Sequence, residues 1–120
     1  MRLPSNLRIK LARDFARVKS QGNSQAGKYL VLGALRAEDV EEFQFGLITG
    51  GRLGNAVVRN RIRRLLREVI RAHRAEIVPG WRMVLIARWR APQATLAELD
   101  HDWLRLARRM NLLKPAPSGT

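Results

Sequence analysis

Arginine side chains are concentrated in residues 59–74, where their number and spacing would suit the binding of phosphate groups. Glu68 is the only acid in this segment. On a helix, most of these arginines would fall within a sector about 120° wide. Solvated helix faces normally mix acids and bases at i,i+4 spacing, so this one-sided face indicates an anion-binding surface. The arginines are Arg59, Arg61, Arg63, Arg64, Arg67, Arg71 and Arg74.

Arg61 and the loop before this segment extend the candidate surface. Arg61 points toward the edge of the apolar stripe beside Asn60, so periodicity leaves a structural role and a phosphate contact equally open. The loop residues 50–55 contain three glycines, which let a backbone approach a ligand, and a cation, Arg52. Asn55 would cap the helix, whose N-terminus also attracts phosphate.

A catalytic site within the protein is not expected. Asp100, His101 and Asp102 are consecutive, and on a helix such residues diverge by about 100° each, so we read them as a solvent-exposed face. His73, at the apolar edge of the arginine helix, is expected to be structural. The acidic cluster of Glu38, Asp39, Glu41 and Glu42 is read as a hairpin turn. We therefore predict no catalytic residues and no metal ligands in the protein.

Composition limits the class of protein and its partners. The chain has 120 residues, of which 46% are hydrophobic, and this fits one folded domain. A net charge of +13 favours a polyanionic partner, with nucleic acid first and an anionic membrane second. Arginine outnumbers lysine, which favours RNA. The absence of cysteine, of an apolar run in residues 1–10 and of a membrane-length apolar stretch predicts a soluble cytoplasmic protein.

Hydrophobic periodicity predicts three helices and three strands. Val58, Ile62, Leu65, Leu66, Val69 and Ile70 form the apolar stripe of the arginine helix, about 56–75. The capping box Thr95–Glu98 begins a last helix. The run 81–89 is read as a buried central strand, and 28–36 with 43–49 as an antiparallel hairpin. A first helix is expected at about 12–21, carrying Phe15 and Val18 on one face.

These elements predict an α+β fold in the order α-β-β-α-β-α, a small two-layer sandwich with helices packed on a central sheet. Residues 1–114 are expected to form a single RNA-binding domain. Within it, residues 1–10 read as an irregular basic arm. Residues 115–120 are expected to be a disordered tail.

The run from Gly54 to Glu68, with Arg59-Asn60-Arg61 at its core, closely resembles the signature of the bacterial ribonuclease P protein family. Further agreement comes from Asp14-Phe15 with Val18 and Gly22, from Gly46-Leu47 and from the apolar third strand. The resemblance covers residues 7 to 112 approximately. It implies a left-handed β-α-β crossover, against the usual right-handed rule.

The resemblance also implies a function and a set of site residues. In this family a catalytic RNA removes the 5′ leader of precursor tRNA, and the protein binds the leader in a cleft and contacts the RNA subunit. Magnesium ions would be bound mainly by the RNA and substrate. The resemblance places Arg59, Asn60, Arg61, Arg63, Arg64 and Arg67 against the ribozyme, and we add Arg52, Asn55 and Arg71. Phe15, Lys19 and Tyr29 are expected to line or flank the leader cleft.

Two departures from the family pattern affect the leader site. Lys19 stands where many members carry a second aromatic residue, so it offers a phosphate contact and poorer stacking. Gly50-Gly51-Arg52 replaces a Ser-Lys-Lys run and keeps one cation. Phe15 on its own would be read as core, whereas the resemblance favours a ring that stacks on a leader base.

Two other classes of function are weighed against this one. A ribosomal or assembly protein would share the charge without needing a leader cleft. A DNA-binding protein would use Asn60 among arginines to read base edges, but the chain lacks an obvious helix-turn-helix or dimer signature. No DNA or membrane partner is expected.

Overall fold

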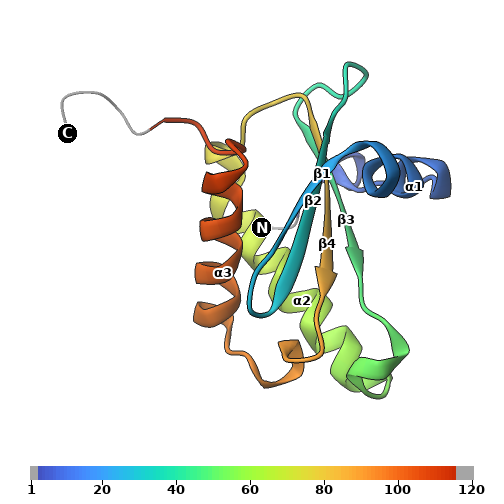
Figure 1. Cartoon of the computed structure of the whole chain (residues 1–120), viewed down its shortest axis with the longest axis vertical. Helices are drawn as coiled ribbons and strands as arrows, with labels where there is room; N and C mark the ends of the chain where they lie inside the picture. Colours follow the sequence, from blue (N-terminus) through green and yellow to red (C-terminus); the bar gives the residue numbers. More distant parts are fainter. Residues whose placement is uncertain (1–2, 116–120) are drawn as a thin grey trace.

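A four-stranded sheet in the order β1-β2-β4-β3 organises residues 3–115, the part of the chain that the computed structural model describes (Figure 1). The elements follow one another as α1 Ala12–Gln21, β1 Asn23–Ala26, β2 Leu30–Arg36, β3 Phe43–Ile48, α2 Ala56–His73, β4 Trp81–Ala87 and α3 Leu96–Arg109. The predicted α+β class and helices are confirmed. The strand β1 was missed because its four residues are all exposed and show no apolar alternation.

The position of β4 corrects the predicted hairpin. Strands β2 and β3 are not neighbours, because β4 lies between them, antiparallel to β2 and parallel to β3. Residues Arg82 to Leu85 are all buried, and a strand this apolar is most stable with a strand on either side and cover on both faces. The prediction of a central strand here is confirmed.

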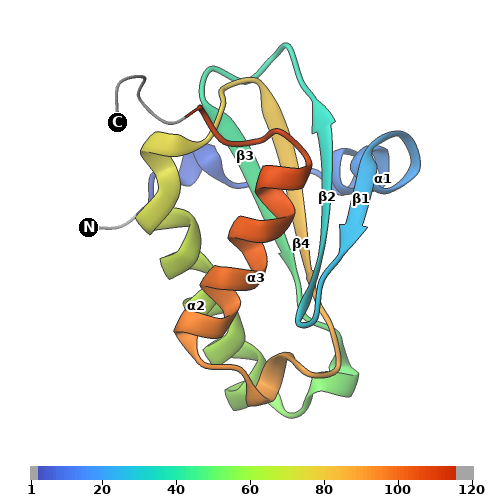
Figure 2. The same cartoon turned by 60° about the vertical axis from the view of Figure 1, so that its left-hand side comes forward.

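The connection β3-α2-β4 is left-handed. In Figure 2, α2 and α3 lie on the viewer's side of the sheet, β3 and β4 both run downward, and β4 lies to the right of β3. This is the crossover that the family resemblance implied, and it departs from the usual handedness of parallel units.

The main core lies between the sheet and the two long helices. The face of α2 that carries Ile62, Leu66 and Ile70 is fully buried, as the sequence stripe predicted. Trp103 and Leu106 of α3 are equally inaccessible. The predicted caps are present: Asn55 Oδ1 accepts the Val58 N–H at 3.1 Å, and Thr95 with Glu98 forms a complete capping box. Each cap satisfies N–H groups that the helix itself leaves free.

The opposite face of the sheet is covered only in part, by the short helix α1 (Figure 1). Val18 of α1 packs with Ile9 and Val84 in a small second core. The buried guanidinium of Arg82 holds this helix in place, since its Nη2 lies 3.8 Å from Asp14 Oδ2 and 2.7 Å from Asp39 Oδ2. Together these contacts fix where α1 presents Phe15.

The N-terminal arm is more ordered than predicted. Residues Ser5–Leu7 form a 3-10 turn, and Leu7 is 1% exposed. Arg8 forms a parallel bridge with Phe45 of β3, and the Ile9 N–H donates to the Phe45 carbonyl at 2.9 Å. The arm therefore extends the edge of the sheet beside β3. The predicted tail falls mainly on residues 116–120, which lie outside the described residues.

Three acidic groups outside α2 have structural partners, and one of them, Asp102, is less exposed than predicted. Asp39 and Glu42 lie in the predicted turn, where Asp39 remains exposed and pairs with Arg82, and Glu42 accepts two hydrogen bonds from Arg74, at 2.7 and 2.9 Å. Asp102 was placed on a solvent-exposed face and is instead 3% exposed. Its carboxylate accepts the N–H groups of Lys28, Tyr29 and Leu30, which fixes the β1–β2 turn against α3.

His73 joins the end of α2 to α3. Its Nδ1 lies 2.6 Å from Glu76 Oε2, its Nε2 lies 2.7 Å from Asp100 Oδ1, and its ring stacks on Trp103 with the ring centres 5.6 Å apart. This confirms the structural role that the sequence predicted. Burial disfavours the charged ring, but the hydrogen bonds to Glu76 and Asp100 outweigh it and raise the pKa of His73 above 6.5.

This arrangement predicts that the chain loses stability as the pH rises. Because the folded pKa is raised, the stabilisation is complete below about pH 6.5 and disappears as the pH passes through the folded value. The free energy of unfolding in urea should therefore fall as the pH rises above about 6.5, and His73→Gln should remove most of that slope. His101→Gln is the matched control, because His101 is exposed and makes no ion pair within residues 3–115. An equal pH slope in wild type and His73→Gln would contradict the assignment.

Candidate nucleic-acid interface

The uncovered half of the sheet face beside α1 carries apolar side chains. Val31, Ile86 and Ile48 are opposite one another across β2, β4 and β3, and all three are half-buried. Side chains two residues apart on a strand share a face, so Ile86 lies on the same side as Val84, which packs under α1. The short α1 thus leaves an accessible apolar floor.

Phe15 stands at the border of this floor. Its ring lies directly over Gly46 of β3, where a larger residue has no room: a Cβ at Gly46 would come within 2.3 Å of Phe15 Cε1. The ring is half-buried and packs against the second core. The ring atoms Cε1 and Cζ therefore lie against the backbone of β3, and the residue type at position 46 controls where the ring can lie.

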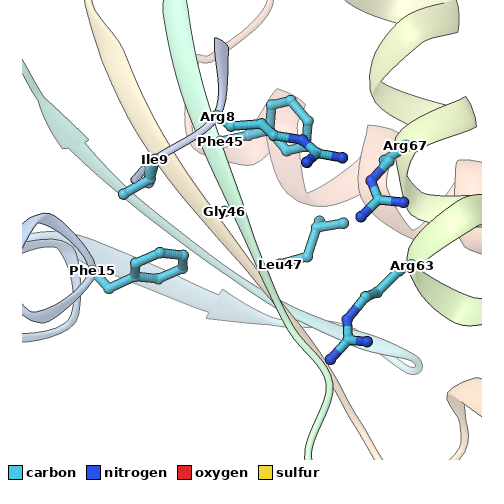
Figure 3. Close-up of a pocket in the computed structure, with 8 residues that line it drawn as sticks. All are labelled: Arg8, Ile9, Phe15, Phe45, Gly46, Leu47, Arg63 and Arg67. Atoms are coloured by element: carbon cyan, nitrogen blue, oxygen red, sulfur yellow. The ribbon is translucent and has the colours of Figure 1, made fainter. Parts of the chain in front are cut away.

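Three arginines line the other side of β3 from Phe15 (Figure 3). Arg63 and Arg67 project from α2, and the guanidinium of Arg8 points toward that of Arg67. Together with Phe15 they border a hollow of about 170 Å³, which we call the cleft. Its lining residues are Arg8, Ile9, Phe15, Phe45, Gly46, Leu47, Arg63 and Arg67.

The arginines of the cleft repel one another. Burial, followed by the charges of Arg8 and Arg63, lowers the pKa of the Arg67 guanidinium below its ordinary value. Arg67 Nε is inaccessible and has no hydrogen-bond partner among the described residues. Like charges so close together are unfavourable in the free protein, and a bound phosphate would relieve the repulsion.

A second hollow of about 570 Å³ continues from the cleft along α2. It shares Arg8, Phe45 and Arg67 with the cleft, so the two form one trough between the N-terminal arm, β3 and α2. The residues that line this second part are Leu3, Arg8, Phe45, Arg64, Arg67, Glu68 and Arg71. The arginine trough, as we call the two hollows together, carries one carboxylate against five guanidinium groups.

The arginines of α2, together with its C-cap residue Arg74, divide into a paired and an unpaired set. Toward the C-terminus, Arg71 pairs with Glu68 at 2.6 Å and Arg74 with Glu42 at 2.7 Å. Toward the N-terminus, no carboxylate within residues 3–115 lies at salt-bridge distance from Arg59, Arg63, Arg64 or Arg67. The sequence predicted one uniform face, whereas the structure leaves its N-terminal half as the part ready to bind an anion.

Three polar residues at the start of α2, Asn55, Asn60 and Arg61, form hydrogen bonds within the protein. Asn60 Oδ1 accepts from Arg63 at 3.0 Å, and Asn55 is used as the helix cap. Arg61 donates to the carbonyls of Pro92 and Ala94, at 3.5 and 3.3 Å, so it holds the β4–α3 loop. The structural reading of Arg61 therefore has direct support, and RNA contacts of Arg61, Asn55 and Asn60 stay predictions.

The loop before α2 contains one glycine with a conformational requirement. Gly54 has φ +143°, and a Cβ there would press on Val58. Gly50 and Gly51 face open space, and Arg52 beside them is exposed. This leaves room for a ligand at the N-terminus of α2.

The structure separates the residues predicted for the leader cleft. Lys19 is exposed one helical turn after Phe15 on α1. Tyr29 lies elsewhere: it is 8% exposed, its hydroxyl donates to Glu98 Oε2 at 2.8 Å, and it packs in the core beneath α3. The placement of Tyr29 at the cleft was wrong. The Asp102 carboxylate of α3 accepts the N–H groups of Tyr29 and Leu30, so the start of β2 lies against α3. This helix covers the face of the sheet opposite to the one that carries Phe15.

Sequence reasoning missed Arg8 and did not foresee the role of Gly46. Arg8 reaches the trough only because the arm pairs with β3, a strand far from it along the chain. The alternation Leu7-Arg8-Ile9, apolar at both ends, was the one local signal for this extended segment.

The fold and the arginine trough together define a small α+β protein that binds a polyanion, with an aromatic ring and an apolar floor beside the cations. Comparison with known proteins makes this specific. The family model for Ribonuclease P matches residues 3–111, and the chain belongs to this family. Its role is that of the protein subunit of ribonuclease P, an endoribonuclease that processes the 5′ ends of tRNA.

Individual relatives support the assignment to this family. The chain is 39% identical over 114 residues to the ribonuclease P protein component of Acidothermus cellulolyticus, covering 93% of this chain and 94% of the relative. It is 34% identical over 110 residues to that of Brevibacillus brevis, covering 92% and 87%. The solved structure of the Staphylococcus aureus RNase P protein superposes with a TM-score of 0.83 at 28% identity, covering 90% of this chain and 98% of that one.

Proposed function

We propose that this chain binds the catalytic RNA of ribonuclease P and the 5′ leader of precursor tRNA, while the RNA performs the cleavage. The observation that carries this proposal is the arginine trough, where Arg8, Arg63 and Arg67 face one another and form no ion pair with a carboxylate of the described residues. Such a surface neutralises phosphates and offers no group suited to activate water. The protein then supplies position and charge, and the chemistry belongs to its partner.

The leader fits the cleft and the apolar floor beside it. A leader nucleotide stacked on Phe15 would place its phosphates toward Arg8 and Arg63, while Ile48 and Ile86 would contact the sugar or base edge. Aromatic stacking tolerates any base, so this site suits leaders of differing sequence. We further infer that the protein acts in the cytoplasm, where precursor tRNA is processed. Within residues 3–115, no helix is long and apolar enough to cross a bilayer.

Filling the space under the Phe15 ring should weaken leader binding. In Gly46→Val the new side chain would displace the ring, so affinity for precursor tRNA should fall about tenfold, the scale of one base–aromatic stack. Affinity for mature tRNA, which has no leader, should not change. The measurement is the ratio of the two dissociation constants for the holoenzyme.

A double-mutant cycle tests whether Gly46 acts through the ring. Phe15→Ala should cause a similar loss, and Gly46→Val should add little to it, because both changes remove the same stack. Additive losses, or equal losses with mature tRNA, would show that the substitution damages the fold instead.

In this proposal the magnesium ions are bound by the RNA and not by the protein. Within residues 3–115, no group of three or more His, Cys, Asp or Glu side chains is arranged so that it could hold a metal ion, so the described residues do not fit a protein-only metal site. We propose that Mg²⁺ is held mainly by phosphates of the RNA subunit and the substrate. The protein would assist by lowering the repulsion among those phosphates.

Reconstitution tests the proposal as a whole. The chain is mixed with a bacterial ribonuclease P RNA at low magnesium, and cleavage of precursor tRNA is followed with and without protein. We expect stimulation by the wild type and little by Arg63→Ala/Arg67→Ala. A general RNA-binding protein would bind without stimulating correct 5′ cleavage, and that result would sink the proposal.

A further inference from the structure

Trp89 is an exposed aromatic residue that neither the core nor the trough uses. Its side chain is 65% exposed, whereas Trp103 is 0% exposed. The guanidinium of Arg90 lies 4.6 Å from the centre of the Trp89 ring. An exposed indole with a cation on one face leaves a broad aromatic surface for another flat ring.

The loop that carries Trp89 is held at both ends. On one side, the Arg88 N–H donates to the Tyr29 carbonyl at 2.8 Å and the Arg88 guanidinium donates to the Gly27 carbonyl. On the other side, Arg61 of α2 holds the carbonyls of Pro92 and Ala94. Because these bonds fix the loop in advance, a ligand that stacks on Trp89 loses little free energy in ordering it.

The charge around Trp89 favours a polyanion. Arg88 and Arg90 flank Trp89, and the sequence from Trp81 to Ala97 holds no acid. The loop lies next to the start of α2 and away from α1 (Figure 1), so it is distant from the Phe15 side of the sheet and close to the N-terminus of the arginine helix. An RNA bound along the first turns of α2 is therefore within reach of Trp89.

We propose that Trp89 and Arg90 form a second stacking platform, which binds an unpaired nucleotide of the ribonuclease P RNA. The indole face would contact the base, and Arg90 would hold the ring and meet the adjacent phosphate. This inference rests on the proposed RNA binding by α2 and adds to it a site outside the trough. In this arrangement Arg61 would position the platform relative to α2, through its hydrogen bonds to the Pro92 and Ala94 carbonyls.

Titration with a bacterial ribonuclease P RNA tests the platform. Trp89→Ala should weaken binding at least about fivefold, while Trp89→Phe, which keeps a ring, should stay close to wild type. The salt dependence of binding should keep its slope in Trp89→Ala, because no charge is lost, and decrease by about one in Arg90→Ala. Leu96→Ala is the matched control, since Leu96 is also an exposed apolar residue, at 43%, and should bind normally.

Fluorescence gives a second readout that a merely structural residue would not change. The emission that is present in wild type and absent in Trp89→Phe should be quenched by the RNA and protected from acrylamide. Equal affinity of Trp89→Ala and wild type, or unchanged acrylamide access in the complex, would overturn the platform. A loss as large in Trp89→Phe as in Trp89→Ala would also overturn it.

Two further results show which RNA the platform binds and whether the platform or the proposed function has failed. A Trp89→Ala effect seen with isolated precursor tRNA, but not with the ribonuclease P RNA, would overturn the assignment to the catalytic RNA. Failure of the wild type to bind either RNA would refute the proposed function itself, whereas the platform alone fails if wild type and Trp89→Ala bind equally well.

Discussion

Replacing Arg63 and Arg67 together with alanine should weaken binding to ribonuclease P RNA by at least about tenfold near 0.1 M salt and flatten its salt dependence. Each arginine that neutralises a phosphate releases counterions, so removing two should lower the slope of log K against log salt by about 1.4 to 1.8. Both side chains line the cleft, and neither has a carboxylate partner within residues 3–115. Arg67 is paired with Arg63 in this test because it joins both hollows of the trough.

The control variant also removes two positive charges, but outside the arginine trough. Arg108→Ala/Arg109→Ala lies at the exposed end of α3, outside the trough, and it lowers the net charge by the same amount. The slope in this variant should stay close to that of wild type. If both double variants lose affinity and slope equally, binding depends on total charge and the trough has no special part.

The Arg63→Ala/Arg67→Ala variant should be at least as stable as wild type in the absence of RNA. The pKa of Arg67 is lowered by burial and by its neighbours Arg8 and Arg63, which shows that the charged group is unfavourably placed when no anion is bound. Arg67→Ala removes that repulsion at the expense of some packing of its alkyl chain. Loss of RNA affinity without loss of stability is what separates a binding residue from a structural one.

The helix α2 was predictable because several local signals agree on it. A cap at Asn55, an apolar stripe every three to four residues and arginines on the other face all indicate the same helix. The strand order was less accessible. Strands β2 and β3 are close in sequence, which favours a hairpin, and only the burial of β4 on both faces places it between them.

Residues that act across long sequence distances were the hardest to predict. Nothing local links Arg8 to Phe45, or Phe15 to Gly46, and the trough depends on both contacts. Tyr29 was assigned by position in a motif, whereas its place is decided by Asp102 in the last helix. Charge and periodicity thus identify the surface, and the pairing of distant segments decides which residues share a site.

Asp102→Ala should be among the most destabilising single changes in the chain. The carboxylate is buried and accepts three backbone N–H groups, at 3.1, 2.9 and 3.1 Å, from Lys28, Tyr29 and Leu30. Alanine leaves these donors without a partner, and each buried unsatisfied group costs about 1–3 kcal/mol, so a loss of roughly 3–5 kcal/mol is expected after relaxation. The measurement is the free energy of unfolding in urea with the RNA absent.

The pH dependence identifies the carboxylate as the cause. Burial alone would raise the pKa of Asp102, but the three N–H groups together with Arg105 outweigh it and bring the pKa below 3.8. A depressed folded pKa means that the stabilisation is present above about pH 4 and is lost as the pH falls through the folded value. Wild type should therefore lose more stability than Asp102→Asn on acidification below about pH 4.

Asp102→Asn is also the matched variant for structure, because it keeps the shape and one acceptor oxygen. It should fall between wild type and Asp102→Ala in stability, since an amide accepts more weakly than a carboxylate. The β1–β2 turn that Asp102 fixes also holds Arg88 at the base of the Trp89 loop. If Asp102→Ala proved as stable as wild type, the carboxylate could not be what determines where β2 begins, and the displacement of Tyr29 from the cleft would need another cause.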